Sequence, residues 1–135
     1  MHWELSFDNK SPELIQAIED AVQFVETNGA SNQALYHVRF VLEEMGTNIL
    51  KYGYDDADTH RVYFRVDLTA DTVQVLLEDD GHEFDPTKTA APDTTLPLEQ
   101  RTPGGLGLML VRKLVRRLDY ERRDGKNYST ILITR

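Results

Sequence analysis

Two side chains that could take part in catalysis or ligand binding lie four residues apart in the segment LEEMGTNILKYGY: the carboxylate of Glu44 and the carboxamide of Asn48. In a helix, such residues lie about 40° apart on neighbouring turns. A carboxylate can orient a water or hydroxyl, and a carboxamide oxygen can ligate a hard cation. An ordinary hydrogen bond at a helix edge also explains the pair. Gly46 between them suggests that something approaches the helix backbone closely.

A second candidate is LEDDGHEFDP, which gathers acids around Gly81. The acids Glu78, Asp79 and Asp80 are adjacent, whereas an EF-hand loop alternates its ligands, so the pattern does not predict calcium. The four histidines have no short spacing typical of a zinc site, and the chain contains no cysteine. The acids must therefore do something other than hold one of these metals.

A third candidate is the glycine cluster TPGGLGLMLV, with Gly104, Gly105 and Gly107. Successive glycines let backbone N–H groups point at an anion, and the helix that follows adds its positive end. The cluster lacks the Gly-Lys-Ser/Thr of a Walker loop, and it is preceded by a proline-containing loop rather than the strand of a Rossmann fingerprint. A phosphate cradle and a flexible loop before a helix both remain open.

Hydrophobic periodicity predicts the elements that position these residues. Ser11 and Ser31 are predicted to cap two helices, which end near Asn28-Gly29 and Tyr54. A third helix is predicted after the glycines, with apolar residues as far as Leu118 facing inward. Strands are predicted at 3–7, 61–69, 72–78, 120–123 and 128–134, and the last two flank a hairpin turn at 124–127. This order favours an α+β two-layer sandwich.

The composition fits one domain spanning residues 1–135, with a long loop at about 86–103. The net charge of −8 argues against direct nucleic-acid binding, although six basic residues cluster between 112 and 123. That cluster could meet an acidic partner or a bound phosphate, or it could be a solvated helix face. No segment predicts a membrane span or a leader, so we expect a soluble cytoplasmic protein without membrane contact.

In order along the chain, Glu44-x-x-x-Asn48, Asp79-x-Gly81 and Gly105-x-Gly107 resemble the N, G1 and G2 boxes of the GHKL ATPase superfamily, which includes gyrase, histidine kinases and MutL. Nearly the whole chain is similar to the anti-sigma-factor serine/threonine kinases of bacterial partner-switching systems. The phrases LEEMGTNILKYGY, LEDDGHEFDP and TPGGLGLMLVRKL carry this similarity.

The resemblance implies a Bergerat-type sandwich, with a mixed, mainly antiparallel sheet, helices on one face and the 86–103 loop as a lid over ATP. It implies that Glu44 is the general base and that Asn48 ligates Mg²⁺. Asp79 would accept a hydrogen bond from the adenine amino group, Gly81 would let the backbone pass close to the base, and Thr130 would support adenine through water. The residues implied to meet the phosphates are Gly104, Gly105, Leu106, Gly107 and Leu108.

Arg101 could neutralise the γ-phosphate, or it could be a plain surface arginine. The sequence departs from the family pattern at two positions. Glu83 stands where many relatives have a second glycine, and Tyr52 stands where some have histidine. Both departures bear on nucleotide binding.

The function implied is phosphorylation of a serine or threonine on a STAS-domain anti-sigma-factor antagonist, by a homodimeric kinase that also binds a sigma factor or another downstream regulator. One alternative is a sequestration protein of the same fold that binds its partner without catalysis. Another is the catalytic fragment of a sensor histidine kinase. The last ranks lowest, because no helix pair with a phospho-accepting histidine precedes the motifs.

Overall fold

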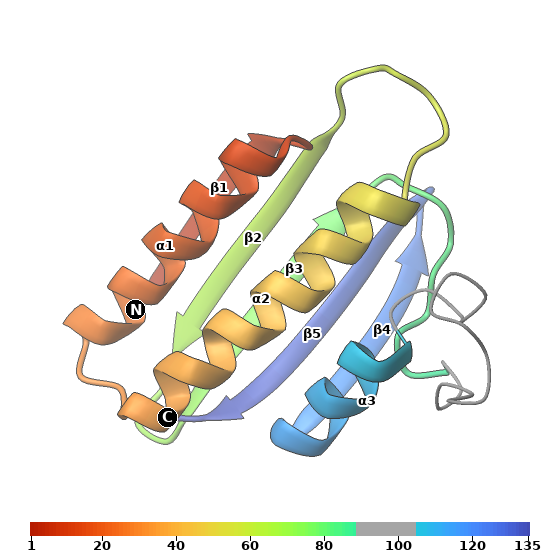
Figure 1. Ribbon diagram of the computed structural model, residues 1–135. Helices are drawn as coiled ribbons and strands as arrows, with labels where there is room; N and C mark the ends of the chain where they lie inside the picture. The colour runs from red at the N-terminus through yellow and green to blue at the C-terminus, as the bar shows by residue number, and fades with distance from the viewer. Residues whose placement is uncertain (89–104) are drawn as a thin grey trace.

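The elements form a helical layer over one face of an antiparallel sheet (Figure 1). The computed structural model describes residues 1–88 and 105–135. Within these ranges the chain forms β1 (His2–Asp8), α1 (Ser11–Thr27), α2 (Asn32–Tyr52), β2 (Arg61–Leu68), β3 (Thr72–Asp79), α3 (Gly105–Leu114), β4 (Arg117–Arg123) and β5 (Lys126–Thr134). No helix in the described ranges is long and apolar enough to cross a membrane.

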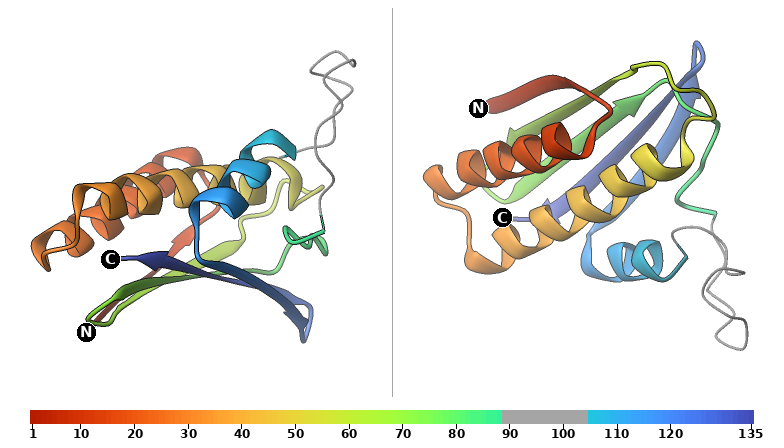
Figure 2. Two further views of the ribbon diagram at one scale, coloured as in Figure 1. Left: turned by 90° about the horizontal axis from the view of Figure 1, so that it is seen from below. Right: turned by 45° about the horizontal axis from the view of Figure 1, so that its top comes forward.

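The strand order is β1-β2-β3-β5-β4, and all four pairings are antiparallel. Viewed along the sheet, the helices lie on one side of it (Figure 2). The predicted α+β two-layer architecture is therefore confirmed. The sequence predicted a mixed sheet, but the described strands include no parallel pair.

Alternating side chains of the central strands build the core. In β2, β3 and β5 the buried positions recur at every second residue, as expected for strands with one covered face. Phe64, Leu77 and Ile131 are among the largest fully buried side chains, and they pack beneath α1 and α2. Near the loop end of the sheet, the same buried face of β3 and β5 carries polar side chains instead.

The two long helices begin differently. Ser31 caps α2 as predicted, because its hydroxyl accepts a hydrogen bond from the backbone N–H of Ala34 at 3.1 Å. The predicted Ser11 cap is wrong: Ser11 is the first residue of α1, and Lys10 occupies the cap position without a side-chain bond. Glu13 instead reaches back and accepts from the backbone N–H of Asp8 at 2.5 Å.

The third helix is shorter than predicted. It ends at Leu114, and the backbone N–H of Arg116 already donates to the carbonyl of Leu132 in the sheet at 2.8 Å. Leu118 lies in β4 rather than in the helix, yet it still packs against the core. An apolar residue in that place suits a helix or a strand, so periodicity alone could not fix the boundary.

Gly46 permits close packing of α1 against α2. A Cβ added to it would lie 2.7 Å from Cδ1 of Leu14 in α1 and 3.4 Å from Cζ of Phe64 in β2. The sequence suggested that something lies close to the backbone at Gly46, and the neighbours found there are core side chains rather than a ligand. This packing fixes the position of the α2 turns that carry Glu44 and Asn48.

Candidate functional site

Buried polar side chains mark one end of the sheet. Among the described residues, the buried polar or charged ones are Asp79, Asn127 and Ser129, with 6%, 5% and 7% of their surface exposed. The β3–β5 register places Asp79 opposite Asn127 and Leu77 opposite Ser129. Because side chains opposite each other in a sheet point to the same face, these groups converge on one place beneath α2.

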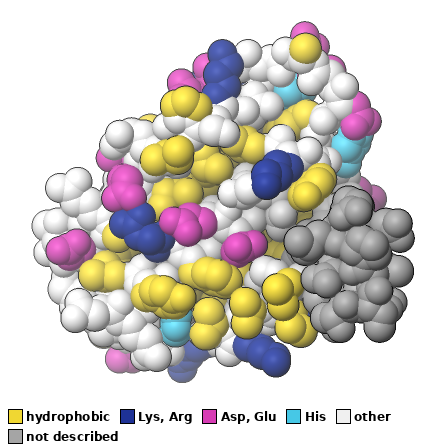
Figure 3. All heavy atoms as spheres, in the orientation of Figure 1, with side chains coloured by type: hydrophobic (Ala, Val, Ile, Leu, Met, Phe, Trp, Pro, Cys, Tyr) yellow, Lys and Arg dark blue, Asp and Glu magenta, His cyan; other side chains and the backbone are white. Residues whose placement is uncertain are grey.

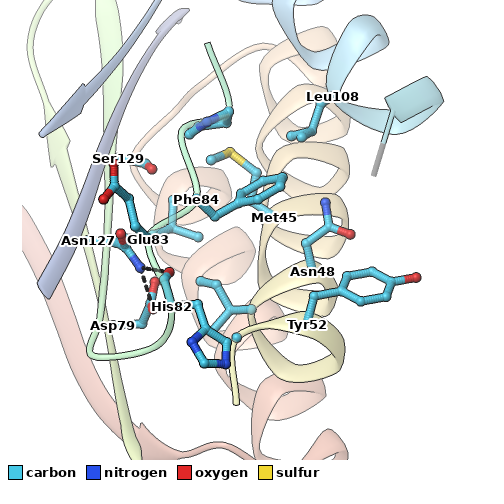
Figure 4. Close-up of a pocket in the computed structure, with 14 residues that line it drawn as sticks. Met45, Asn48, Tyr52, Asp79, His82, Glu83, Phe84, Leu108, Asn127 and Ser129 are labelled. Carbon is cyan, nitrogen blue, oxygen red and sulfur yellow. Dashed lines mark hydrogen bonds between the residues drawn. The ribbon is translucent and has the colours of Figure 1, made fainter. Parts of the chain in front are cut away.

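A cavity lies at this place, with walls from α2, the end of β3, residues 82–86, Leu108 of α3, and β5 (Figure 4). It encloses about 90 Å³. Sites for small-molecule ligands usually have roughly 300–1,000 Å³, so a large ligand requires part of the wall to move. In Figure 4 the ring of Phe84 lies between the β5 side chains and Asn48 of α2. Phe84 therefore divides the cavity between its β5 side and its α2 side.

Asp79 is held through one of its two carboxylate oxygens. Its Oδ1 accepts hydrogen bonds from the backbone N–H of Gly81 at 2.9 Å and from Nδ2 of Asn127 at 3.0 Å. No described residue donates to Oδ2, so that oxygen is available to a ligand in the cavity. Burial raises the pKa of the Asp79 carboxyl, and the two hydrogen bonds oppose this rise.

Asn48 projects from α2 into the same cavity. Its Nδ2 is buried and has no hydrogen-bond partner in the described part of the chain. An unpaired buried donor of this kind is uncommon and calls for an explanation. Because no described residue holds the amide by a hydrogen bond, its oxygen can bind a cation or ligand. The residue therefore fits the chemistry of a Mg²⁺ ligand.

Glu44 lies where α2 meets the first turn of α3. A Cβ added to Gly107 would overlap the Glu44 carboxylate, so the absence of a side chain at Gly107 leaves room for the carboxylate in its present position. The Glu44 side chain makes no hydrogen bond to a described residue and keeps its full capacity as an acceptor. The N-terminal end of α3, which favours anions, thus lies beside a carboxylate that no described residue pairs with.

A groove on the outer surface of the helical layer leads to the same position. It runs between α1 and α2, and Glu44 lines it. Asn48 and Tyr52 line both this groove and the cavity, so the two spaces share a wall. Figure 3 shows the helical face, where apolar and charged side chains are intermixed. A group lying in the groove would therefore contact Glu44 without entering the cavity.

Comparison with known proteins identifies the family. The model of the histidine kinase-like ATPase domain matches residues 9–133. The chain belongs to this family. The sequence-based assignment to the family is therefore confirmed, as is the fold that the assignment implies.

Two curated relatives show where in the family the chain lies. The serine/threonine-protein kinase BtrW of Bordetella bronchiseptica is 28% identical over 116 residues, which cover 83% of this chain and 82% of the relative. The serine-protein kinase RsbW of Halalkalibacterium halodurans is 26% identical over 92 residues, covering 65% and 56%. The aligned segment thus spans just over half of the second relative.

The residues predicted to contact phosphates differ in their exposure and in whether they line the cavity. Leu108 is 1% exposed and lines the cavity, whereas Leu106 is 52% exposed. Gly105 is the first residue of α3. Arg101, Gly104 and most of the predicted lid at 86–103 lie outside the described residues.

The predicted role of Thr130 is corrected by the strand register. Thr130 is opposite Leu76, and both lie on the sheet face that the helices do not cover. Ser129, one residue earlier, is on the covered face and lines the cavity. A shift by one residue in a strand exchanges the two faces, and the sequence assignment made this shift.

Asn127 was missed as a site residue because Asp124-Gly125-Lys126-Asn127 was interpreted only as a hairpin turn. The turn itself is confirmed, with positive φ angles at Asp124 (54°) and Gly125 (77°). Asn127, however, is the second residue of β5 and is buried. The available signal was a pair of polar residues, Asn127 and Ser129, on the same face of the strand as Ile131 and Ile133, but its interpretation required the pairing of β5 with β3.

The two departures from the family pattern both line the cavity. Glu83 and Tyr52 are among its lining residues, and Tyr52 keeps 48% of its surface exposed at the shared wall. Both are thus placed where a ligand would meet them.

Gly81 is needed for contact with the end of α2. A Cβ on it would lie 2.6 Å from the carbonyl oxygen of Gly53, which also accepts a hydrogen bond from the backbone N–H of His82 at 2.8 Å. We expect Gly81→Ala to push the loop away and to destabilise the fold by about 1–3 kcal/mol. Chemical denaturation measures this loss.

The matched control for Gly81→Ala is His82→Ala. It keeps the backbone hydrogen bond and removes a half-exposed side chain that pairs with Asp55 at the surface. Such a surface pair contributes at most about 1 kcal/mol, so this variant should stay close to the parent protein. Equal stability of both variants and the parent would show that the contact with Gly53 is unimportant.

Proposed function

We propose that this protein is an ATP-dependent serine/threonine kinase that transfers a phosphoryl group to a protein substrate. The observation that carries the proposal is the position of Glu44. Its carboxylate has no hydrogen bond to a described residue, and it lies beside the first turn of α3, one helical turn from Asn48, in the lining of an open groove. The kinase names of the two relatives support the same reaction class.

Each group of the site has a task in this reaction. Asp79 reads the base from the floor of the cavity, and the α3 N-terminus receives the phosphates. Glu44 accepts a hydrogen bond from the incoming serine or threonine hydroxyl and aligns it for attack. Asn48 supplies an oxygen ligand for Mg²⁺, which neutralises phosphate charge when it is bound. Phosphoryl transfer requires mainly this positioning and charge neutralisation.

The partner we propose is a STAS-domain anti-sigma-factor antagonist, with release of the kinase upon phosphorylation. The freed kinase, which we propose is a homodimer, then binds a sigma factor or another regulator. The resemblance to partner-switching kinases supports these assignments. Affinity capture with the tagged protein, with and without ATP and Mg²⁺, tests them. Capture that is insensitive to nucleotide, or of proteins without a STAS domain, would contradict them.

Incubation with γ-labelled ATP, Mg²⁺ and the captured antagonist tests the reaction itself. We expect label on a serine or threonine of the antagonist, identified by mass spectrometry. Stable complex formation without label transfer would instead favour the sequestration protein. Label on a histidine would point to the sensor-kinase alternative, and a sample without protein kinase separates transfer from background.

A further inference from the structure

Asn127 uses the full hydrogen-bonding capacity of its amide. Its Nδ2 donates to Oδ1 of Asp79 at 3.0 Å and to the carbonyl of His82 at 2.7 Å. Its Oδ1 accepts from the hydroxyl of Tyr120 at 2.5 Å and from Nη1 of Arg122 at 3.0 Å. A carboxamide has two donor hydrogens and an acceptor oxygen with two lone pairs, so nothing is left unpaired. Asn127 is 5% exposed, and its orientation is therefore fixed.

This network holds both the carboxylate and the loop that follows it. Arg122 also donates to the carbonyl of Gly81 at 3.0 Å, so successive loop carbonyls at 81 and 82 are tied to the β4–β5 hairpin. At Asp79, both hydrogen bonds end on Oδ1. The consequence is a carboxylate whose rotation is restricted and whose Oδ2 is left for the cavity.

We propose that Asn127 is a positioning residue for purine recognition: by holding Oδ1 of Asp79, it presents Oδ2 as the acceptor for the exocyclic amino group of adenine. The inference rests on the proposed function, in which Asp79 reads the base. Asn127 itself does not touch the ligand in this scheme. It acts through the orientation and charge of Asp79.

The charge of Asp79 depends on the same contact. Burial raises the pKa of Asp79, while the hydrogen bonds from Asn127 and from the Gly81 N–H lower it. The other groups that face this carboxyl also contribute. Asp80 raises the pKa, Arg122 lowers it, and the phenol of Tyr54 interacts with Asp79 from beyond the end of α2. His82 and Glu83 lie on the cavity wall beside it.

Recognition of the adenine amino group should depend on whether Asp79 is charged. An amino group donates more strongly to a carboxylate than to a neutral carboxyl, so base recognition is present above the pKa of Asp79 and is lost as pH falls through it. Without the Asn127 donor that pKa rises further, and recognition should be lost at a higher pH. A purely structural role for Asn127 would not produce this shift.

The test measures the affinity of Asn127→Leu and of the parent protein for two ligands over a pH series. The ligands are ATP and purine riboside triphosphate, which lacks the 6-amino group, each with Mg²⁺. We expect the parent to prefer ATP by about 10-fold at neutral pH, through one hydrogen bond to a charged group. In Asn127→Leu we expect the preference at neutral pH to fall to a few-fold at most, and what remains of it to be lost at a higher pH than in the parent, because the pKa of Asp79 loses a hydrogen bond that lowers it.

Tyr120→Phe is the matched control. It removes a different hydrogen bond of the same buried amide and leaves the donor to Asp79 in place. We expect it to keep the parent's preference and pH profile. Should Asn127→Leu fail to fold, Asn127→Asp provides the same comparison with a side chain of equal shape, and the added negative charge should raise the midpoint further.

Each result bears on the inference. An equal loss of affinity for both ligands in Asn127→Leu, or an unchanged preference for ATP, would overturn it. So would a change in preference in Tyr120→Phe as large as that in Asn127→Leu. A parent protein that binds ATP and the analogue equally well would refute base reading by Asp79 while leaving nucleotide binding intact. A parent that binds neither ligand would refute the proposed function.

Discussion

Glu44→Gln is expected to abolish phosphoryl transfer to the protein substrate while leaving ATP binding close to that of the parent. The amide keeps the size of the side chain beside Gly107 but loses the negative charge that we propose aligns the hydroxyl. General-base groups contribute roughly 10²–10⁴-fold, so the rate of transfer should fall by about that factor. Single-turnover transfer of labelled phosphate measures the rate, and equilibrium binding of a fluorescent ATP analogue measures affinity.

The neighbouring Glu43 provides the control. It is exposed on the same helix, and Glu43→Gln makes the same chemical change without altering the contact with α3. We expect this variant to transfer phosphate at the parental rate. Two results would contradict the role of Glu44: transfer that persists in Glu44→Gln, or a loss of ATP affinity equal to the loss of rate. The second would assign Glu44 to binding rather than to transfer.

Local sequence signals predicted helix caps and turns correctly where the residues concerned strongly favour one backbone structure. The Ser31 cap and the Asp124-Gly125 turn are examples. The Ser11 cap failed because Glu13 provides another way to satisfy a backbone N–H before α1. The end of α3 was missed because the residues from 115 to 118 suit either a helix or a strand, and contact with Leu132 decides between them.

The residues of the site that belong to short sequence motifs could be predicted from the sequence. Asp79 and Asn48 line one cavity, and Glu44 adjoins the first turn of α3, so the three motifs do converge. The contributions of β5 were not predictable in this way. Ser129 and Asn127 enter the site through their register with β3, a pairing of segments about 50 residues apart in sequence. No local pattern specifies such a register, which is set by the packing of the whole sheet.

Asn48→Leu should make the protein more stable in the absence of ligand and unable to respond to ATP with Mg²⁺. The parent buries Nδ2 without a partner among residues 1–88 and 105–135, and an unsatisfied buried donor costs about 1–3 kcal/mol. Leucine has the same branching as asparagine, and its extra volume can fill part of the cavity beside Met45 and Leu108. The free energy of unfolding should therefore rise by about 1–2 kcal/mol. Denaturant titration measures this gain.

The same substitution removes the oxygen proposed to ligate Mg²⁺. A ligand that binds the folded state raises its melting temperature, and this rise should disappear in Asn48→Leu when ATP and Mg²⁺ are added together. Asn48→Asp retains an oxygen ligand and should keep a metal-dependent rise. A leucine variant that is both less stable and still stabilised by ATP with Mg²⁺ would contradict the assignment. If Asn48→Leu is more stable but no longer responds to ATP with Mg²⁺, then Asn48 serves ligand binding at a cost in stability.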